Sequence, residues 1–308
     1  MNSIEINKLT KKFGKFISVN EISFNVKEGE IFGFLGANGA GKSTTIRMLC
    51  GILAPTSGDA TVAGFSVSKN PEEVKRRIGY MSQRFSLYND LTIEENINFF
   101  GGVYGLSGKE LSERKDWVLK IADLRGKEKI LTGSLPGGIK QRLALGTAVI
   151  HRPPIVFLDE PTSGVDPISR KRFWELINEL SADGTTLFVT THYLEEAEYC
   201  NNIVLLDEGK IIAEGNSKEL KSKYLKEIIW EISCENAVAT IQLLEKQEFA
   251  KEATLFGNNI HLIADSTIES EKQLADLLQS RGISVTQVDK IVPSLEDVFV
   301  HLLSEEKE

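Results

Sequence analysis

The pattern of apolar residues divides the chain into stretches with strand-like and helix-like spacing. Apolar runs of strand length occur at residues 31–35, 155–158 and 187–189. The first two runs are followed by stretches whose apolar residues recur at helical spacing. Residues 4–30 predict strands and turns, and residues 203–213 hold two apolar runs around a polar turn, which predicts a hairpin. Together these segments predict an α/β core.

A mainly helical stretch interrupts this core. Its apolar residues recur at helical spacing in two groups, Ile93, Ile97 and Phe100, then Trp117, Ile121 and Leu124. Thr92 followed by Glu95 resembles a capping box, which predicts the start of a helix. We interpret residues 84–150 as a helical insertion into the α/β core.

The last 91 residues predict a second, smaller domain. A lysine-rich stretch at residues 218–226 is interpreted as a link. Beyond it, the patterns predict strands and helices in the order strand 227–234, helix 236–247, strand 253–264, helix 270–280, strand 283–292 and a final helix from Pro293. This order predicts a small α+β domain, so we expect two domains, residues 1–217 and 218–308.

Composition narrows the class of protein. The chain of 308 residues is 41% hydrophobic and 26% charged, which is ordinary for a globular protein, and no window approaches 18 consecutive apolar residues. We therefore expect no membrane-spanning helix, and the N-terminus lacks the features of a secretory signal. The three cysteines show neither metal-binding spacing nor a disulfide framework, which is typical of a reducing cytosol.

The net charge of −8 is unevenly distributed. Residues 216–308 hold 10 Lys and Arg against 17 Asp and Glu, a net charge of −7, and the remainder of the chain contributes −1. A general nucleic-acid-binding protein needs a basic face to displace phosphate counterions. The charge therefore argues against nucleic acid as a partner.

A glycine-rich loop follows the first apolar run. It consists of Gly36, Ala37, Asn38, Gly39, Ala40, Gly41, Lys42, Ser43 and Thr44, and it reads G-x-x-x-x-G-K-[ST], the pattern of a P-loop. A strand that leads through such a turn into a helix aims free backbone N–H groups at one point. We expect Lys42 to lie between the β- and γ-phosphates of a nucleotide and Ser43 to offer its hydroxyl to Mg²⁺.

Two carboxylates end the apolar strand at residues 155–158. Asp159 and Glu160 occupy the position of Walker B carboxylates, where the Asp holds Mg²⁺ through its water and the Glu polarises the attacking water as general base. The alternative is an acidic strand end that faces solvent. The P-loop upstream favours the catalytic interpretation.

The complete ordered set of motifs resembles that of the ABC ATPases over about residues 1–215. The resemblance rests on residues 36–44, Gln83, residues 135–142, residues 158–166 and His192. It implies a RecA-like P-loop core with a helical insertion, and it implies ATP and Mg²⁺ as ligands. The segment at residues 293–299 resembles the C-terminal extension of bacterial drug-export-type ABC ATPases.

The resemblance also implies roles for single residues. Phe13 takes the aromatic position that stacks on adenine, and Gln83 contacts Mg²⁺ or the attacking water. His192 hydrogen-bonds the γ-phosphate. Gly137 and Gly138 open a helix whose N–H groups meet the γ-phosphate held by the other subunit of a dimer.

Three further positions bear on that dimer. Asp166 belongs by resemblance to the loop that spans the dimer, although a role as helix N-cap explains it equally well. The family's signature commonly reads Leu-Ser-Gly-Gly-Gln, whereas this chain has Pro136 in place of the Ser and Ile139 in place of the Gln. Proline removes a hydroxyl and a backbone donor, and Ser134 lies two places upstream.

These implications predict an ATP-hydrolysing subunit of a membrane transporter. Two subunits, expected to be copies of this chain, close head to tail around two MgATP and drive a separate transmembrane permease from the cytoplasmic face of the membrane. The tail favours export of drugs or other hydrophobic compounds. Residues 84–88 are the candidate docking segment; the alternative is that Phe85 and Leu87 pack inside the helical insertion. The alternative is an ATP-dependent dimerisation switch with weak hydrolysis. A DNA-repair ABC protein is disfavoured, because the chain has no long coiled-coil insertion. A translation-type ABC protein is disfavoured, because the sequence contains a single P-loop where that class has two nucleotide domains.

Overall fold

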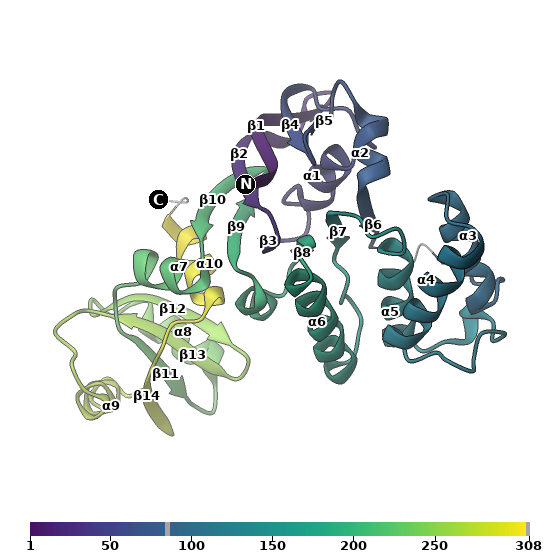
Figure 1. Cartoon of the computed structure of the whole chain (residues 1–308). Helices are drawn as coiled ribbons and strands as arrows, with labels where there is room; N and C mark the ends of the chain where they lie inside the picture. Colours follow the sequence, from purple (N-terminus) through teal and green to yellow (C-terminus); the bar gives the residue numbers. More distant parts are fainter. Residues whose placement is uncertain (84–86, 306–308) are drawn as a thin grey trace. The chain divides into compact units, whose positions relative to one another are not determined.

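The computed structural model describes residues 1–83 and 87–305 of the chain (Figure 1). The chain divides into two compact units, Met1–Asn216 and Ser217–Glu308. The division lies one residue from the expected one.

A six-stranded sheet forms the centre of the first unit, in the order β10-β9-β3-β8-β7-β6. Its strands are β3 (Ile31–Gly36), β6 (Ile78–Met81), β7 (Ile155–Asp159), β8 (Thr186–Thr191), β9 (Asn202–Asp207) and β10 (Lys210–Gly215). The strands from β6 to β9 are parallel, and β10 pairs with β9 as the expected antiparallel hairpin. Every residue of β3, β7 and β8 is buried, as expected for strands covered on both faces.

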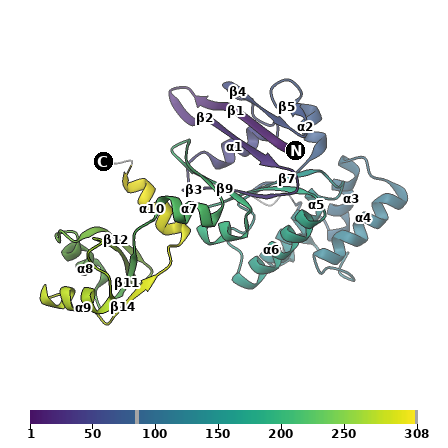
Figure 2. The ribbon, with the colours of Figure 1, turned by 60° about the vertical axis from the view of Figure 1, so that its left-hand side comes forward.

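A second, antiparallel sheet covers one face of the central sheet. It has the order β2-β1-β4-β5 and contains β1 (Asn2–Phe13), β2 (Phe16–Lys27), β4 (Ser57–Val62) and β5 (Phe65–Ser66). Helix α1 (Lys42–Leu49) buries apolar side chains in the same core as both sheets, and α2 (Pro71–Arg77) contributes Val74 to it. Figure 2 shows both helices beside this sheet. Stacked rings of Phe24 and Phe32, with centroids 5.2 Å apart, join the two sheets.

Helices cover the other face of the central sheet. Helices α3 (Ile93–Val103), α4 (Gly108–Ile121), α5 (Gly137–Ala148) and α6 (Pro167–Ala182) share one apolar core with the inner strands. The capping box predicted at Thr92 and Glu95 is confirmed at the start of α3, and Asp166 caps α6 by accepting from Ser169 N at 3.0 Å. Two short 3₁₀ turns, η1 (Thr132–Ser134) and η2 (Leu194–Tyr199), complete the unit.

The second unit is a split βαβ fold. Its antiparallel sheet has the order β12-β13-β11-β14, built from β11 (Ile229–Ser233), β12 (Ala250–Phe256), β13 (Asn259–Ala264) and β14 (Gln287–Ile291). Helices α8 (Ala237–Leu244) and α9 (Glu271–Ser280) share a core with one face of this sheet, and α10 (Leu295–Glu305) closes the unit.

Two predictions for this unit were wrong in detail. The single strand expected at residues 253–264 is a hairpin, because Gly257 adopts a positive φ of 56° and the chain reverses there. The expected link at residues 218–226 contains a helix, α7 (Ser217–Tyr224), in which Leu220 is fully buried while Lys218 and Lys223 are exposed.

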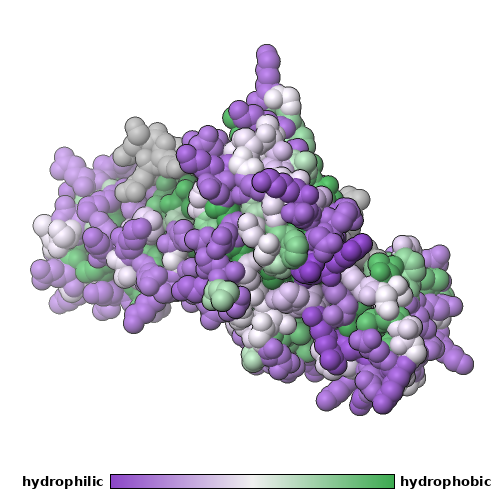
Figure 3. All heavy atoms as spheres, turned by 45° about the horizontal axis from the view of Figure 1, so that its top comes forward, coloured by the Kyte–Doolittle hydropathy of each residue, from purple (hydrophilic) through white to green (hydrophobic). Residues whose placement is uncertain are grey.

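Within residues 1–83 and 87–305, no helix has the length and apolar character needed to cross a membrane. The face drawn in Figure 3 is largely hydrophilic, with hydrophobic residues in small patches. Across the same described residues, no group of three or more His, Cys, Asp or Glu side chains is arranged to hold a metal ion.

Candidate nucleotide-binding site

The strand order brings three chain segments to one edge of the central sheet. Strand β8 lies between β3 and β7, and all three are parallel, so their carboxyl ends meet. The P-loop follows β3, Asp159 and Glu160 end β7, and His192 follows β8. Ligands of open α/β sheets bind outside such carboxyl ends.

The loop between β3 and α1 depends on glycine. Gly41 is the N-cap of α1 with a φ of 108°, and a Cβ there would lie 2.5 Å from the carbonyl oxygen of Ser18. At Gly36 a Cβ would overlap the carbonyl oxygen of Leu206. The close approach leaves the first N–H groups of α1 pointing out of the loop, where an anion is favoured.

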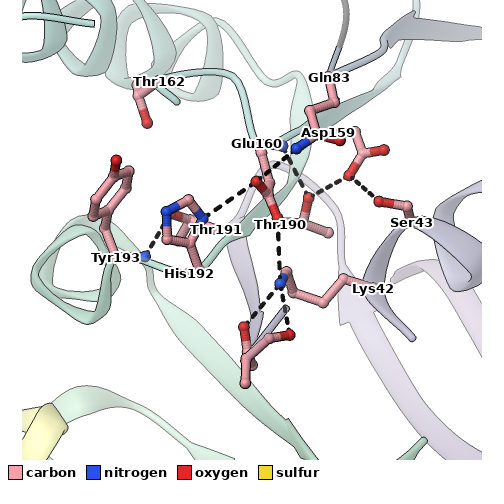
Figure 4. A network of polar contacts seen from close by, with 12 residues as sticks. Lys42, Ser43, Gln83, Asp159, Glu160, Thr162, Thr190, Thr191, His192 and Tyr193 are labelled. Atoms are coloured by element: carbon pink, nitrogen blue, oxygen red, sulfur yellow. Dashed lines mark hydrogen bonds and ion pairs between the residues drawn. The ribbon is translucent and has the colours of Figure 1, made fainter. Parts of the chain in front are cut away.

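Lys42 is buried at the start of α1 and faces back into the loop. Its Nζ donates to the carbonyl oxygens of Gly36 at 2.8 Å and Ala37 at 3.1 Å, and it lies 3.3 Å from Glu160 Oε1 (Figure 4). The ammonium group therefore lies between the loop and the carboxylate.

Ser43 and Asp159 form a pair of oxygen donors beside this lysine. Ser43 Oγ donates to Asp159 Oδ1 at 3.0 Å, and Thr190 Oγ1 donates to the same oxygen at 2.9 Å. Burial raises the pKa of Asp159 above its ordinary value, although both hydrogen bonds act in the opposite direction. A hydroxyl and a carboxylate side by side fit the oxygen ligands that Mg²⁺ prefers.

Glu160 is the centre of the polar network. Its backbone has a φ of 48°, unusual for a residue other than glycine, and its N–H donates to Thr190 O at 3.1 Å and Oγ1 at 3.0 Å. Its Oε2 accepts from Gln83 Nε2 at 3.0 Å and lies 3.2 Å from His192 Nδ1 (Figure 4). The backbone bonds to β8 hold the carboxylate where Lys42, Gln83 and His192 all reach it.

A cavity of about 410 Å³ opens over these groups. It is lined by Phe13, Phe16, Ser18, Asn38, Gly39, Gly41, Lys42, Ser43, Thr44, Gln83 and Glu160. The sequence analysis missed Phe16 and Ser18. Both lie on β2, next to the end of β1, and Phe13 and Phe16 are cross-strand partners. Two exposed aromatic rings therefore line the cavity, with exposed fractions of 49% for Phe13 and 63% for Phe16.

The remaining predicted residues do not line the cavity. Ala40 is buried and shapes the loop, where its carbonyl oxygen accepts from Gly209 N at 3.0 Å. Gly137 and Gly138 begin α5, with Pro136 as N-cap. Gly137 is exposed, whereas a Cβ on Gly138 would overlap Ser169 of α6. Their action on a second subunit stays a prediction.

The candidate docking segment at residues 84–88 falls partly outside the described residues, which omit 84–86. Of the two that are described, Leu87 is buried in the helical core. Tyr88 is 46% exposed, and its ring makes an edge contact with Phe99 of α3 at 5.0 Å between centroids.

Comparisons with known proteins agree with this geometry. Residues 19–163 match the family model described as ABC transporter, and residues 215–303 match that of the ATP-binding protein DrrA1-3-like C-terminal domain.

Relatives extend the match to the whole chain. The linearmycin resistance ATP-binding protein LnrL of Bacillus subtilis is 36% identical over 306 residues, which covers 97% of each chain. The probable multidrug ABC transporter ATP-binding protein YbhF of Escherichia coli is 50% identical over 220 residues, or 71% of this chain. The chain spans only 38% of the length of that relative. A solved dimeric ATP-binding cassette, bound to ADP and Pi in a post-hydrolysis state, superposes with a TM-score of 0.64 at 28% identity. The match covers 69% of this chain and 98% of that chain.

Proposed function

The chain belongs to the ABC transporter ATPases, and we propose that it hydrolyses ATP to energise a separate transmembrane permease. The observation that carries this proposal is the Glu160 carboxylate, held at the cavity wall in contact with Lys42, Gln83 and His192. A carboxylate between a phosphate-binding lysine and two polar side chains can accept a proton from an attacking water.

Each group at the site has a place in the reaction. The P-loop N–H groups and Lys42 bind the phosphates, and the ring of Phe13 stacks on the adenine base of ATP. Water attacks the γ-phosphorus while the bond to the β–γ bridging oxygen breaks, and Glu160 takes the proton of that water. His192 and Lys42 stabilise the charge that develops. The products are ADP and inorganic phosphate.

Mg²⁺ is part of this proposal. Ser43 and Asp159 would hold it, with Gln83 beside them, and the ion would neutralise charge on the β- and γ-phosphates. Ser43 and Asp159 already share a hydrogen bond of 3.0 Å, so their oxygen atoms lie close enough to bind one small cation.

The working unit that we propose is a dimer. Gly137 and Gly138 of a second copy would cap each nucleotide, since Gly137 is exposed at the start of α5 in this chain. The unit would act at the cytoplasmic face of a membrane. The relatives' names, multidrug transport and linearmycin resistance, support export of drugs or other hydrophobic compounds.

Pro136 favours one alternative, a dimerisation switch with weak hydrolysis. The residue offers neither a hydroxyl nor a backbone donor beside the two glycines, so the cap on a partner's nucleotide is weaker. Ser134, the nearest hydroxyl upstream, donates to Leu131 O at 2.8 Å.

The test measures phosphate release and partner capture with the full chain. Wild-type protein should show Mg²⁺-dependent hydrolysis that Glu160→Gln abolishes, with Glu179→Gln on the exposed face of α6 as the matched control. A tagged chain should co-purify with a transmembrane protein whose presence changes the hydrolysis rate. ATP binding without hydrolysis, unaffected by Glu160→Gln, would support the switch.

A further inference from the structure

A buried carboxylate lies behind the site without touching the cavity. Glu196 in η2 has a side chain only 2% exposed. Its Oε1 accepts from Thr162 Oγ1 at 2.5 Å and lies 3.5 Å from Arg170 Nε, whereas its Oε2 has no hydrogen-bond partner within the described part of the chain. Burying a carboxylate with so few partners costs stability, which points to a role other than stability.

The first contact holds the loop that carries the general base. Thr162 is 1% exposed and lies two residues after Glu160, in the loop that leads to the N-cap Asp166. Within that loop, Ser163 N donates to Glu160 O at 3.2 Å and Val165 N donates to Thr162 O at 3.2 Å. Because the loop is tightly turned, the anchor at Thr162 constrains Glu160 as well.

The second contact leads to His192. The Arg170 guanidinium carbon lies 4.3 Å from the centre of the Tyr193 ring, and that ring lies 4.1 Å from the His192 imidazole. His192 Nδ1 in turn lies 3.2 Å from Glu160 Oε2, and Figure 4 shows Tyr193, His192 and Glu160 in succession. The contacts that begin at Glu196 therefore return to Glu160 by two routes.

We propose that Glu196 is a positioning residue for hydrolysis, an inference that rests on the proposed function. It fixes the loop at Thr162 directly and supports His192 through Arg170 and Tyr193. Glu160 and His192 then keep their relative placement when water attacks. Small misplacements of catalytic groups lower the rate of the chemical step more than they lower binding.

The test uses the full chain, four single variants and one double variant. Glu196→Ala removes the acceptor, and Glu195→Ala changes the exposed neighbour as a control. Thr162→Val removes the hydroxyl at constant shape, and Thr162→Ser restores it. We expect Glu196→Ala and Thr162→Val to lower kcat by about 10- to 100-fold with KM within about threefold, as for displaced catalytic groups. Thr162→Ser and Glu195→Ala should retain wild-type kcat.

The double variant Glu196→Ala/Thr162→Val should lose no more activity than the worse single variant, because both substitutions remove the same contact between Thr162 and Glu196. If Glu196→Ala does not fold, the comparison of Thr162→Val with Thr162→Ser tests the proposal by itself. Equal kcat for Thr162→Val and Thr162→Ser would overturn the inference, as would parallel losses in melting temperature and in both kinetic constants. No Mg²⁺-dependent hydrolysis in the wild-type chain would overturn the proposed function itself and this role with it.

Discussion

The proline at the start of α5 offers a measurable perturbation, Pro136→Ser. Pro136 is the N-cap of the helix with φ −57° and ψ 150°, and no side chain caps the helix there. These angles lie in the extended region that an N-cap serine adopts. The carbonyl oxygen of residue 136 already accepts from Ile139 N at 3.1 Å and Lys140 N at 3.0 Å, so the substitution keeps the backbone turn.

Two opposing effects set the change in stability. A serine side chain that caps the exposed N–H groups of α5 contributes about 0.5–2 kcal/mol. Loss of proline's rigidity in the unfolded chain costs about 0.4–1 kcal/mol. The free energy of unfolding should therefore change by between about −0.5 and +1.6 kcal/mol. For a chain of this size, about 1 kcal/mol shifts the melting temperature by about 2–4 °C, so we expect a shift of only a few degrees.

The substitution should not lower turnover. The substitution returns a hydroxyl and an N–H beside Gly137, where we propose that a partner's γ-phosphate binds, and Pro136 does not line this chain's own cavity. We expect kcat to be unchanged or raised by up to about tenfold, less than the contribution of a full oxyanion donor, with nucleotide affinity of the single subunit unchanged.

Steady-state hydrolysis and nucleotide titration of Pro136→Ser and Pro136→Ala test this expectation. Alanine restores the N–H without the hydroxyl, so a gain confined to serine assigns the effect to the hydroxyl. A large loss of ATPase activity in Pro136→Ser would refute the reasoning that the proline weakens the composite site.

Further predictions address packing, base recognition and pH. Gly138→Ala should destabilise the first unit by about 1–3 kcal/mol through overlap with α6, whereas Gly137→Ala, which meets nothing within 4 Å, should not; thermal denaturation distinguishes them. Phe13→Ala should weaken ATP binding by about 1–3 kcal/mol in a fluorescence titration, as for loss of a base-stacking ring, while Phe13→Tyr should not. In the second unit, burial lowers the pKa of His261, but its hydrogen bonds and attraction to Asp297 and a neighbouring glutamate outweigh burial and raise it. The stabilisation is therefore fully present below the ordinary histidine pKa of about 6.5 and is lost as pH rises through the raised value; hydrogen exchange in α10 should accelerate over that range in wild type but not in His261→Gln.

Local motifs made the catalytic half of the site predictable from sequence. The P-loop is one continuous segment and so is the pair Asp159–Glu160, and each follows a strand that the sequence shows as an apolar run. Their proximity required only that the three strands be parallel neighbours, which the fold satisfies. By contrast, Gln83 and His192 are single residues that follow strands, and the family resemblance alone assigned them to the site. Their contacts with Glu160 were not predicted.

Features that depend on pairing or burial were not predictable in the same way. Phe16 lines the cavity because a two-residue turn at Gly14 and Lys15 sets it opposite Phe13, and the sequence analysis did not specify that register. Gly257 and the Asn after it are a hairpin dipeptide inside the stretch at residues 253–264, which the sequence analysis assigned to a single strand. Glu195 and Glu196 are adjacent and identical in type, yet one is exposed and the other buried, which only the packing of η2 decides.

The position of Lys42 links nucleotide binding to the readiness of Glu160. In this structure the ammonium group contacts three oxygen atoms. It donates hydrogen bonds to two loop carbonyls and lies 3.3 Å from Glu160 Oε1. At that separation the gross Coulomb attraction is about 5 kcal/mol for an effective dielectric constant of about 20. A nucleotide phosphate in the loop would offer Lys42 more negative charge than one carboxylate does, so we expect the lysine to turn from Glu160 to the phosphate when a nucleotide binds. That exchange would free Oε1 for a water molecule, while Gln83 and His192 would still hold Oε2. The carboxylate that we propose as the proton acceptor would thus be released by the arrival of the group to be cleaved.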